Sequence, residues 1–158
     1  MRSVVVAGLV VAFFAGLIGW QLRGLDPGVV ELQMAFDARK FGEIVHQWPA
    51  ADLARFRAHL PLDAGLLASY AAFGWLLAVR TRTFSTLSPA GRRWAALAMP
   101  AAAAFDAAEN LAHLWLTEVP RFGVPWAYPM AAGLATAKWI LLLAWMLTLG
   151  WALLKSPR

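Results

Sequence analysis

Residues 94–116 read WAALAMPAAAAFDAAENLAHLWL, an alanine-rich apolar stretch with four polar side chains in its second half. A helix needs about 20 residues to cross a bilayer, and this stretch is long enough. The polar residues recur at i, i+3, i+4 and i+7, which places them on one helical face: Asp106, Glu109, Asn110 and His113. The stretch therefore predicts a membrane-spanning helix with a polar face that avoids lipid.

The composition of the whole chain is typical of a membrane protein. The 158 residues are 61% hydrophobic and 15% charged, with a mean hydropathy of +0.59. Soluble domains are about 45–50% apolar and about 25% charged. This composition excludes an intrinsically disordered chain, because disordered chains have low hydrophobicity. The lack of cysteine excludes a disulfide scaffold, thiol catalysis and an iron–sulfur cluster.

Four apolar stretches have the length of membrane spans: residues 4–22, 62–79, 94–116 and 128–154. We therefore expect an all-α, polytopic membrane protein, with residues 1–158 forming one domain, a bundle of four transmembrane helices. The connections 80–93 and 117–127 are short, so the helices they join should be antiparallel neighbours. The first stretch is longer than a signal-peptide core, so we expect an uncleaved span.

The distribution of charge predicts the orientation of these spans. Residue 2, the connection 80–93 and the segment 155–158 hold only basic charges: Arg2, Arg80, Arg82, Arg92, Arg93, Lys155 and Arg158. By the positive-inside rule, both termini are cytoplasmic and the protein is integral to the cell (inner) membrane. The basic residues form no groove interleaved with aromatic residues, so we expect the lipid bilayer and no nucleic acid as a partner.

The segment 26–60 predicts short amphipathic helices on the outer side, between the first two spans. Asp37 can cap a helix whose apolar positions have helical spacing: Phe41, Ile44, Val45 and Trp48. Asp52 can cap another helix, with Leu53, Phe56 and Leu60 on one face. Such helices can form a lid over the bundle or an anchor at the lipid interface, and both alternatives stay open.

Helix geometry predicts that polar residues from three spans converge inside the membrane. At about 1.5 Å per residue, Asp106 and Lys138 each lie about 15 Å below the outer ends of their spans, and Tyr70 lies about 12 Å below. The expected polar layer comprises Tyr70, Asp106, Glu109, Asn110 and Lys138.

Two further polar residues, Asp63 and His113, should lie above this layer toward the outer surface. Asp63 follows Pro61 and can instead be only the cap of the second span. Lys138 can form an ion pair that merely fixes the register of the helices. Because ionisable residues inside a membrane mark functional sites by default, we favour a functional site.

We expect this site to bind or convert a hydrophobic or amphipathic small molecule, such as a lipid or an isoprenoid, by acid–base chemistry. Asp106 and Glu109 are the expected catalytic acid and base, with Lys138 as counter-charge. The residues expected to bind the substrate are Asn110, Tyr70, Asp63 and His113. Whether the chain is an enzyme or only a binding protein is left open.

Two other functions also fit the sequence. Intramembrane carboxylates carry protons in ion-coupled transporters, and a chain with four spans would then act as a homodimer. In a structural or assembly subunit of a membrane complex, the polar face would pair with a partner protein instead.

Neither a metal nor a cofactor is expected. The sequence holds no glycine-rich phosphate-binding motif. A metal site built from Glu109, His113, His59 and Asp63 would lack the repeated carboxylate-x-x-His pattern of metal sites in helix bundles. A Schiff-base cofactor on Lys138 is chemically open, but one lysine beside carboxylates is typical of an ion pair as well.

Overall fold

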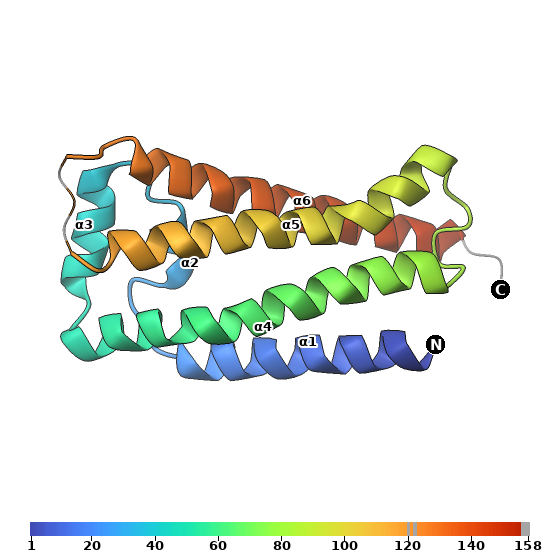
Figure 1. The fold of residues 1–158 in the computed structure, drawn as a ribbon, viewed down its shortest axis with the longest axis horizontal. Coiled ribbons are helices and arrows are strands. Elements are labelled where there is room, and N and C mark those ends of the chain that lie inside the picture. Colours follow the sequence, from blue (N-terminus) through green and yellow to red (C-terminus); the bar gives the residue numbers. More distant parts are fainter. Residues whose placement is uncertain (120, 122, 156–158) are drawn as a thin grey trace.

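The computed structural model describes residues 1–119, 121 and 123–155, which form six helices and no strand. The helices are α1 (Arg2–Gln21), α2 (Val29–Gln33), α3 (Ala38–Gln47), α4 (Ala50–Arg80), α5 (Pro89–Leu116) and α6 (Ala127–Lys155). The four long helices run side by side, and α2 and α3 lie at the end opposite to both termini (Figure 1). The expected all-α class is confirmed.

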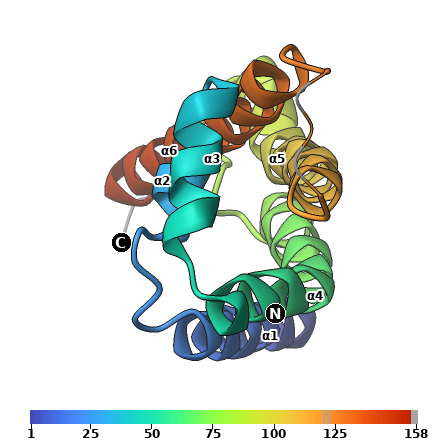
Figure 2. The same cartoon turned by 90° about the vertical axis from the view of Figure 1, so that its left-hand side faces the viewer.

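The long helices pack in the order α1, α4, α5, α6. The pairs α4–α5 and α5–α6 are extensive antiparallel contacts, as their short connections predict. Among the described helices, α1 packs extensively against α4 only, and α2 contacts α6. Seen from the end, the long helices form an arc with α3 across its mouth (Figure 2). The bundle is therefore not closed by direct packing of α1 on α6.

Two glycines of α4 allow its neighbours to approach closely. A Cβ atom at Gly74 would overlap with the Cβ and Cγ atoms of Met99 on α5, and one at Gly65 would overlap with the ring of Phe14 on α1. Small residues at such positions allow helix axes to come together. The arc therefore depends on α4 for two of its three interhelical contacts.

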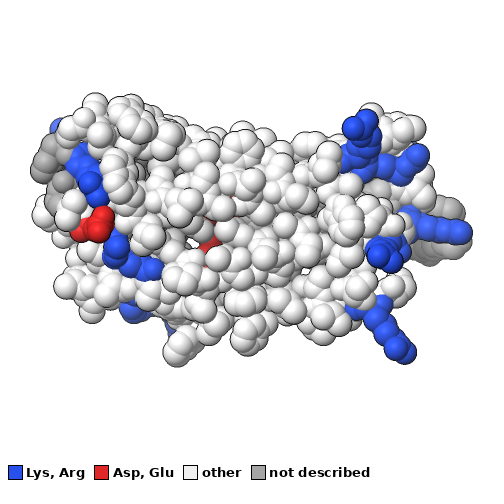
Figure 3. Space-filling view, in the orientation of Figure 1, with Lys and Arg blue, Asp and Glu red and all other residues white. Residues whose placement is uncertain are grey.

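Three helices, α1, α4 and α6, are long and apolar enough to cross a membrane. The fourth predicted span, α5, does not join them, because the polar residues on its inner face lower its mean hydropathy. On the face in Figure 3, charged side chains gather at the two ends of the molecule, and the middle is uncharged apart from one small acidic area. This distribution suggests membrane association.

Helix α4 differs from the predicted arrangement. The amphipathic helix expected after Asp52 is not separate, because α4 runs unbroken from Ala50 to Arg80 through Pro61. Asp52 accepts hydrogen bonds from Arg55 and does not cap the helix. Asp63 lies well inside α4, so the interpretation of Asp63 as a cap is wrong. Proline is a frequent helix boundary, but packing on both sides of α4 keeps the helix continuous here.

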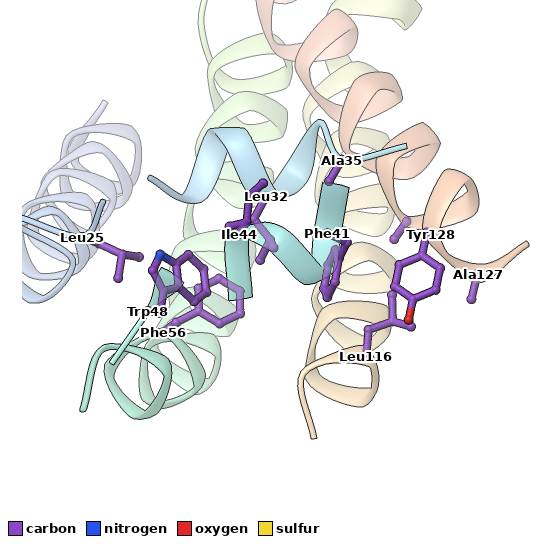
Figure 4. Close-up of a cluster of buried hydrophobic side chains, with 11 residues drawn as sticks. Leu25, Leu32, Ala35, Phe41, Ile44, Trp48, Phe56, Leu116, Ala127 and Tyr128 are labelled. Atoms are coloured by element: carbon purple, nitrogen blue, oxygen red, sulfur yellow. The ribbon is translucent and has the colours of Figure 1, made fainter. Parts of the chain in front are cut away.

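Helix α3 begins as predicted, because the carboxylate of Asp37 accepts a hydrogen bond of 2.8 Å from the backbone N–H of Lys40. Its side chains Phe41 and Ile44 point into the molecule (Figure 4) and are at most 3% exposed. The ring of Phe41 lies 5.2 Å from that of Tyr128, and Trp48 lies 5.1 Å from Phe56. This packing is typical of a lid that covers the end of the bundle, and it favours the lid as the alternative to an interface anchor.

Candidate functional site

A layer of buried polar residues lies between two hydrophobic clusters. The outer cluster, at the end of the molecule that carries α2 and α3, is centred on α3, and the inner cluster, toward the end with both termini, contains Leu67, Met99 and Trp145. Along α5 and α6 the polar residues come between the residues of the two clusters; on α4, Asp63 lies between them and Tyr70 belongs to the inner cluster. We call this layer the polar cluster: Asp63, Tyr70, Asp106, Glu109, Asn110, His113 and Lys138. Each of these except the half-buried Asn110 is at most 9% exposed.

The centre of the polar cluster is Lys138 on α6, which is 3% exposed. Its Nζ lies 3.0 Å from Oδ1 of Asp106 and 2.6 Å from Oε2 of Glu109. The hydroxyl of Tyr70 on α4 donates to Oδ2 of Asp106 at 3.1 Å. The predicted convergence of three helices at one depth is therefore observed for Tyr70, Asp106, Glu109 and Lys138.

Glu109 is the most deeply buried of the carboxylates, with an exposed fraction of 0%. Neither of its oxygens accepts a hydrogen bond from the described residues, so Lys138 stabilises it as a nearby charge. Oε1 lies 3.5 Å from Nδ1 of His113, whose ring packs near those of Phe41 and Phe56. His113 thus joins the polar cluster to the aromatic residues of the outer hydrophobic cluster.

Asp63 and Asn110 form a second polar contact between α4 and α5. Nδ2 of Asn110 donates to Oδ2 of Asp63 at 2.6 Å. The expected layer placed Asn110 beside Lys138, but Asn110 forms its hydrogen bond with Asp63. This contact follows from the rotation of α5, which directs Asp106 and Glu109 toward α6 and Asn110 toward α4.

The polar cluster forms one side of a cavity of about 330 Å³. Its polar lining includes Asp63, Asp106, Asn110 and Lys138, and Glu109 lies behind them outside the lining. The opposite walls are apolar and come mainly from α1, α4 and α6: Ile18, Leu22, Leu60, Leu66, Trp139 and Leu142. Small-molecule pockets are typically about 300–1,000 Å³ and are lined mainly by apolar groups with a few polar ones. The cavity has this character.

Helix α2 adds a wall of the cavity that the sequence did not predict. Val29, Val30 and Gln33 line it, and Oε1 of Gln33 accepts a hydrogen bond of 3.1 Å from Nε1 of Trp139. A single glutamine in a five-residue helix carries no recognisable signal for such a contact. His59 also lines the cavity, and its position four residues before Asp63 could have placed it on this face.

Two arginines near the outer end serve the packing of helices. Arg57 donates to the backbone carbonyl of Leu114 and to the hydroxyl of Thr117, both at 2.9 Å, and so satisfies the C-terminal end of α5. Arg55 donates to the backbone carbonyl of Arg23 at 3.2 Å and to Asp52 at 2.6 Å. Both arginines are thereby engaged away from the polar cluster.

A second cavity, of about 400 Å³, lies between α3 and the outer ends of α4, α5 and α6. Its charged residues are Glu118 and Arg121, which pair with each other at 3.0 Å. Among the described residues, no group of three or more His, Asp or Glu side chains is placed to hold a metal ion. The first cavity therefore combines most of the buried polar side chains with space for a ligand.

Comparison of the chain with protein-family models, with curated proteins and with solved structures finds no match. Function must therefore be inferred from the geometry of the residues.

Proposed function

We propose that the chain crosses the cell (inner) membrane four times, with α5 as the third span in sequence order. The 28 residues of α5 extend about 42 Å, more than the roughly 30 Å of hydrocarbon. Its polar residues are buried against α4 and α6, whereas Leu97, Phe105 and Leu111 are exposed. A helix with polar residues inside and apolar residues outside suits lipid and not water.

The same proposal places both termini in the cytoplasm. Among the described residues, six basic side chains belong to the end that carries the termini: Arg2, Arg80, Arg82, Arg92, Arg93 and Lys155. Arg158 lies outside the described residues. The opposite end, with α2 and α3, carries charges of both signs. This asymmetry supports a cytoplasmic location of the first end under the positive-inside rule.

Within this framework, the polar cluster and its cavity form an intramembrane site that binds or converts an amphipathic small molecule of lipid or isoprenoid type. One observation carries the proposal: a cavity with ionisable groups on one side and apolar walls on the other. The apolar walls suit a hydrocarbon tail, because its burial there costs no hydrogen bonds. The polar lining suits a head group that makes hydrogen bonds.

The contacts suggest a separate role for each ionisable residue. Asp106 lines the cavity and can accept or return a proton of the bound head group. Lys138 also lines the cavity and pairs with both carboxylates. Glu109 does not line the cavity, so in this proposal it positions Lys138 and does not touch the substrate. Tyr70 orients Asp106, and Asn110 orients Asp63.

Native mass spectrometry of the purified protein, after exposure to a total lipid extract, tests this proposal. Leu142→Trp fills the cavity, and Leu143→Trp is its matched control because Leu143 is 53% exposed on the outside of the same helix. We expect a discrete lipid-sized mass on the wild type and on the control, and its loss from Leu142→Trp. Equal occupancy of the two variants, or a wild type that binds nothing, would contradict the proposal. A protein that carries no ligand and exists only as a dimer would instead support the alternative function of an ion-coupled transporter.

Asp106→Asn tests the role of the polar side of the cavity. Asparagine keeps the size of the side chain but removes the negative charge that faces Lys138 and the ligand. We expect weaker binding of the same molecule, with a control in Glu118→Gln, which lies in the second cavity. Unchanged binding in Asp106→Asn would show that the polar cluster does not hold the head group.

A further inference from the structure

The ionisable groups of the polar cluster do not balance in charge. Asp63, Asp106 and Glu109 carry three formal negative charges, and Lys138 carries one positive charge. With the histidines neutral, the cluster has a formal charge of −2. An uncompensated charge inside a membrane costs several kcal/mol, so a positively charged partner would be stabilised here.

Asp63 is the carboxylate that lacks a cation. It is 9% exposed and lines the cavity, and its Oδ2 accepts the hydrogen bond from Asn110. Its Oδ1 accepts no hydrogen bond from the described residues. Lys138 is engaged with the other two carboxylates, and no described salt bridge reaches Asp63. One accessible oxygen of a largely buried carboxylate is therefore available to a ligand in the cavity.

The charges of the lining decide which head groups fit. An amine in its ammonium form has hydrogen-bond donors and no acceptor, which complements two carboxylates. A carboxylate or phosphate head group would instead meet Asp63 and Asp106, and the one nearby cation is already paired. A neutral hydroxyl can hydrogen-bond to Asp63 but leaves its charge uncompensated.

The apolar walls indicate the direction of the tail. Ile18 of α1 and Leu22 directly after it line one side of the cavity, and Trp139 and Leu142 of α6 line another. Since α1 and α6 are not extensively packed against each other, these walls lie at the open side of the arc. A tail between them would lead from the polar cluster toward the surrounding hydrocarbon.

From these observations we infer that the cavity selects an amphipathic amine, whose ammonium group binds to Asp63 and Asp106 and whose hydrocarbon tail lies between α1 and α6. This inference rests on the proposed function and adds the chemical class of the head group.

Three probes with the same dodecyl chain test the inference: dodecylamine, dodecanol and dodecanoate. Affinity for each is measured at neutral pH on the protein in nanodiscs, from the tryptophan fluorescence to which Trp139 at the cavity contributes. Binding to Leu142→Trp is subtracted as partition into the lipid. We expect dodecylamine to bind about 10- to 100-fold more tightly than dodecanol, because both can hydrogen-bond to Asp63 but only the ammonium group compensates its charge. Dodecanoate should bind most weakly.

Asp63→Asn should remove most of the preference for the amine, because only Asp106 is left to bind the ammonium group, and it should keep the binding of dodecanol, which also reports that the variant is folded. Asp52→Asn is the matched control on the same helix, because Asp52 pairs with Arg55 outside the cavity, and it should behave as the wild type. Equal affinity for amine and alcohol in the wild type would overturn the inference, whether or not a variant folds. So would an amine preference that is equally large in Asp63→Asn and in the wild type. If no probe binds better to the wild type than to Leu142→Trp, the proposed function itself fails.

Discussion

Lys138→Met tests whether the polar cluster is held together by charge. Methionine fills similar space without a charge, so the variant leaves the carboxylates of Asp106 and Glu109 without their cation. In the wild type, the Nζ of Lys138 lies 3.0 Å from one carboxylate and 2.6 Å from the other. All three side chains are at most 9% exposed, so water cannot replace the lost charge.

The size of the effect follows from these distances. Two unit charges about 3 Å apart attract by about 5.5 kcal/mol at an effective dielectric constant of about 20. Much of this attraction is offset by the cost of taking the charges out of water. Removal of one partner from a buried ion pair nevertheless costs about 3–5 kcal/mol, because it leaves an uncompensated charge. We expect Lys138→Met to lower the free energy of unfolding by this amount.

Reversible unfolding by denaturant in detergent micelles measures the loss. Lys155→Met is the matched control, because Lys155 lies at the exposed end of the same helix, and it should change stability by less than about 0.5 kcal/mol. The triple variant Asp106→Asn, Glu109→Gln, Lys138→Met should recover most of the lost stability, since it leaves no unpaired charge in the pair. A Lys138→Met protein as stable as Lys155→Met would refute the charge-based account.

Two further substitutions test contacts between α4 and α5. Tyr70→Phe removes the hydroxyl that donates to Asp106 at 3.1 Å, and should cost about 1–3 kcal/mol in the same unfolding assay; an unchanged stability would show that this hydrogen bond contributes nothing. Gly74→Ala forces a methyl group against Met99 on α5 and should cost about 1–3 kcal/mol, whereas Gly16→Ala, with nothing within 4 Å, should be neutral or stabilising. The reverse order for the two glycines would contradict the observed packing of α4 on α5.

The sequence was sufficient to predict the centre of the site. The helical spacing of Asp106 and Glu109 gave their common face, and a rise of about 1.5 Å per residue placed Lys138 at the depth of Asp106. The predicted proximity is observed, with Nζ of Lys138 within 3.0 Å of both carboxylates. Such estimates work because long, nearly parallel helices convert sequence distance directly into depth.

The features that escaped prediction depend on tertiary packing. The sequence predicts that the second span begins at residue 62, directly after Pro61, but α4 runs through Pro61 and packs against both α1 and α5. The wall formed by α2 includes a hydrogen bond between Gln33 and Trp139, which are far apart in the sequence, and Leu32 is buried in the outer hydrophobic cluster. Sequence periodicity predicts which side of a helix is polar, but it does not predict which other segment of the chain packs against that side.

The order of the helices in the arc follows from their polar residues. Helix α5 carries acids, an amide and an imidazole on one face, so it needs neighbours on both sides, and α4 and α6 supply Asp63 and Lys138 to it. Helix α1 has no charged residue between Arg2 and its end, so it can stand at the edge of the arc with one neighbour. An apolar edge helix leaves the cavity bordered by side chains that tolerate lipid. The placement of polar residues on α4, α5 and α6 thus buries the charged groups, and the apolar α1 at the edge leaves an apolar path from the surface of the bundle to these groups.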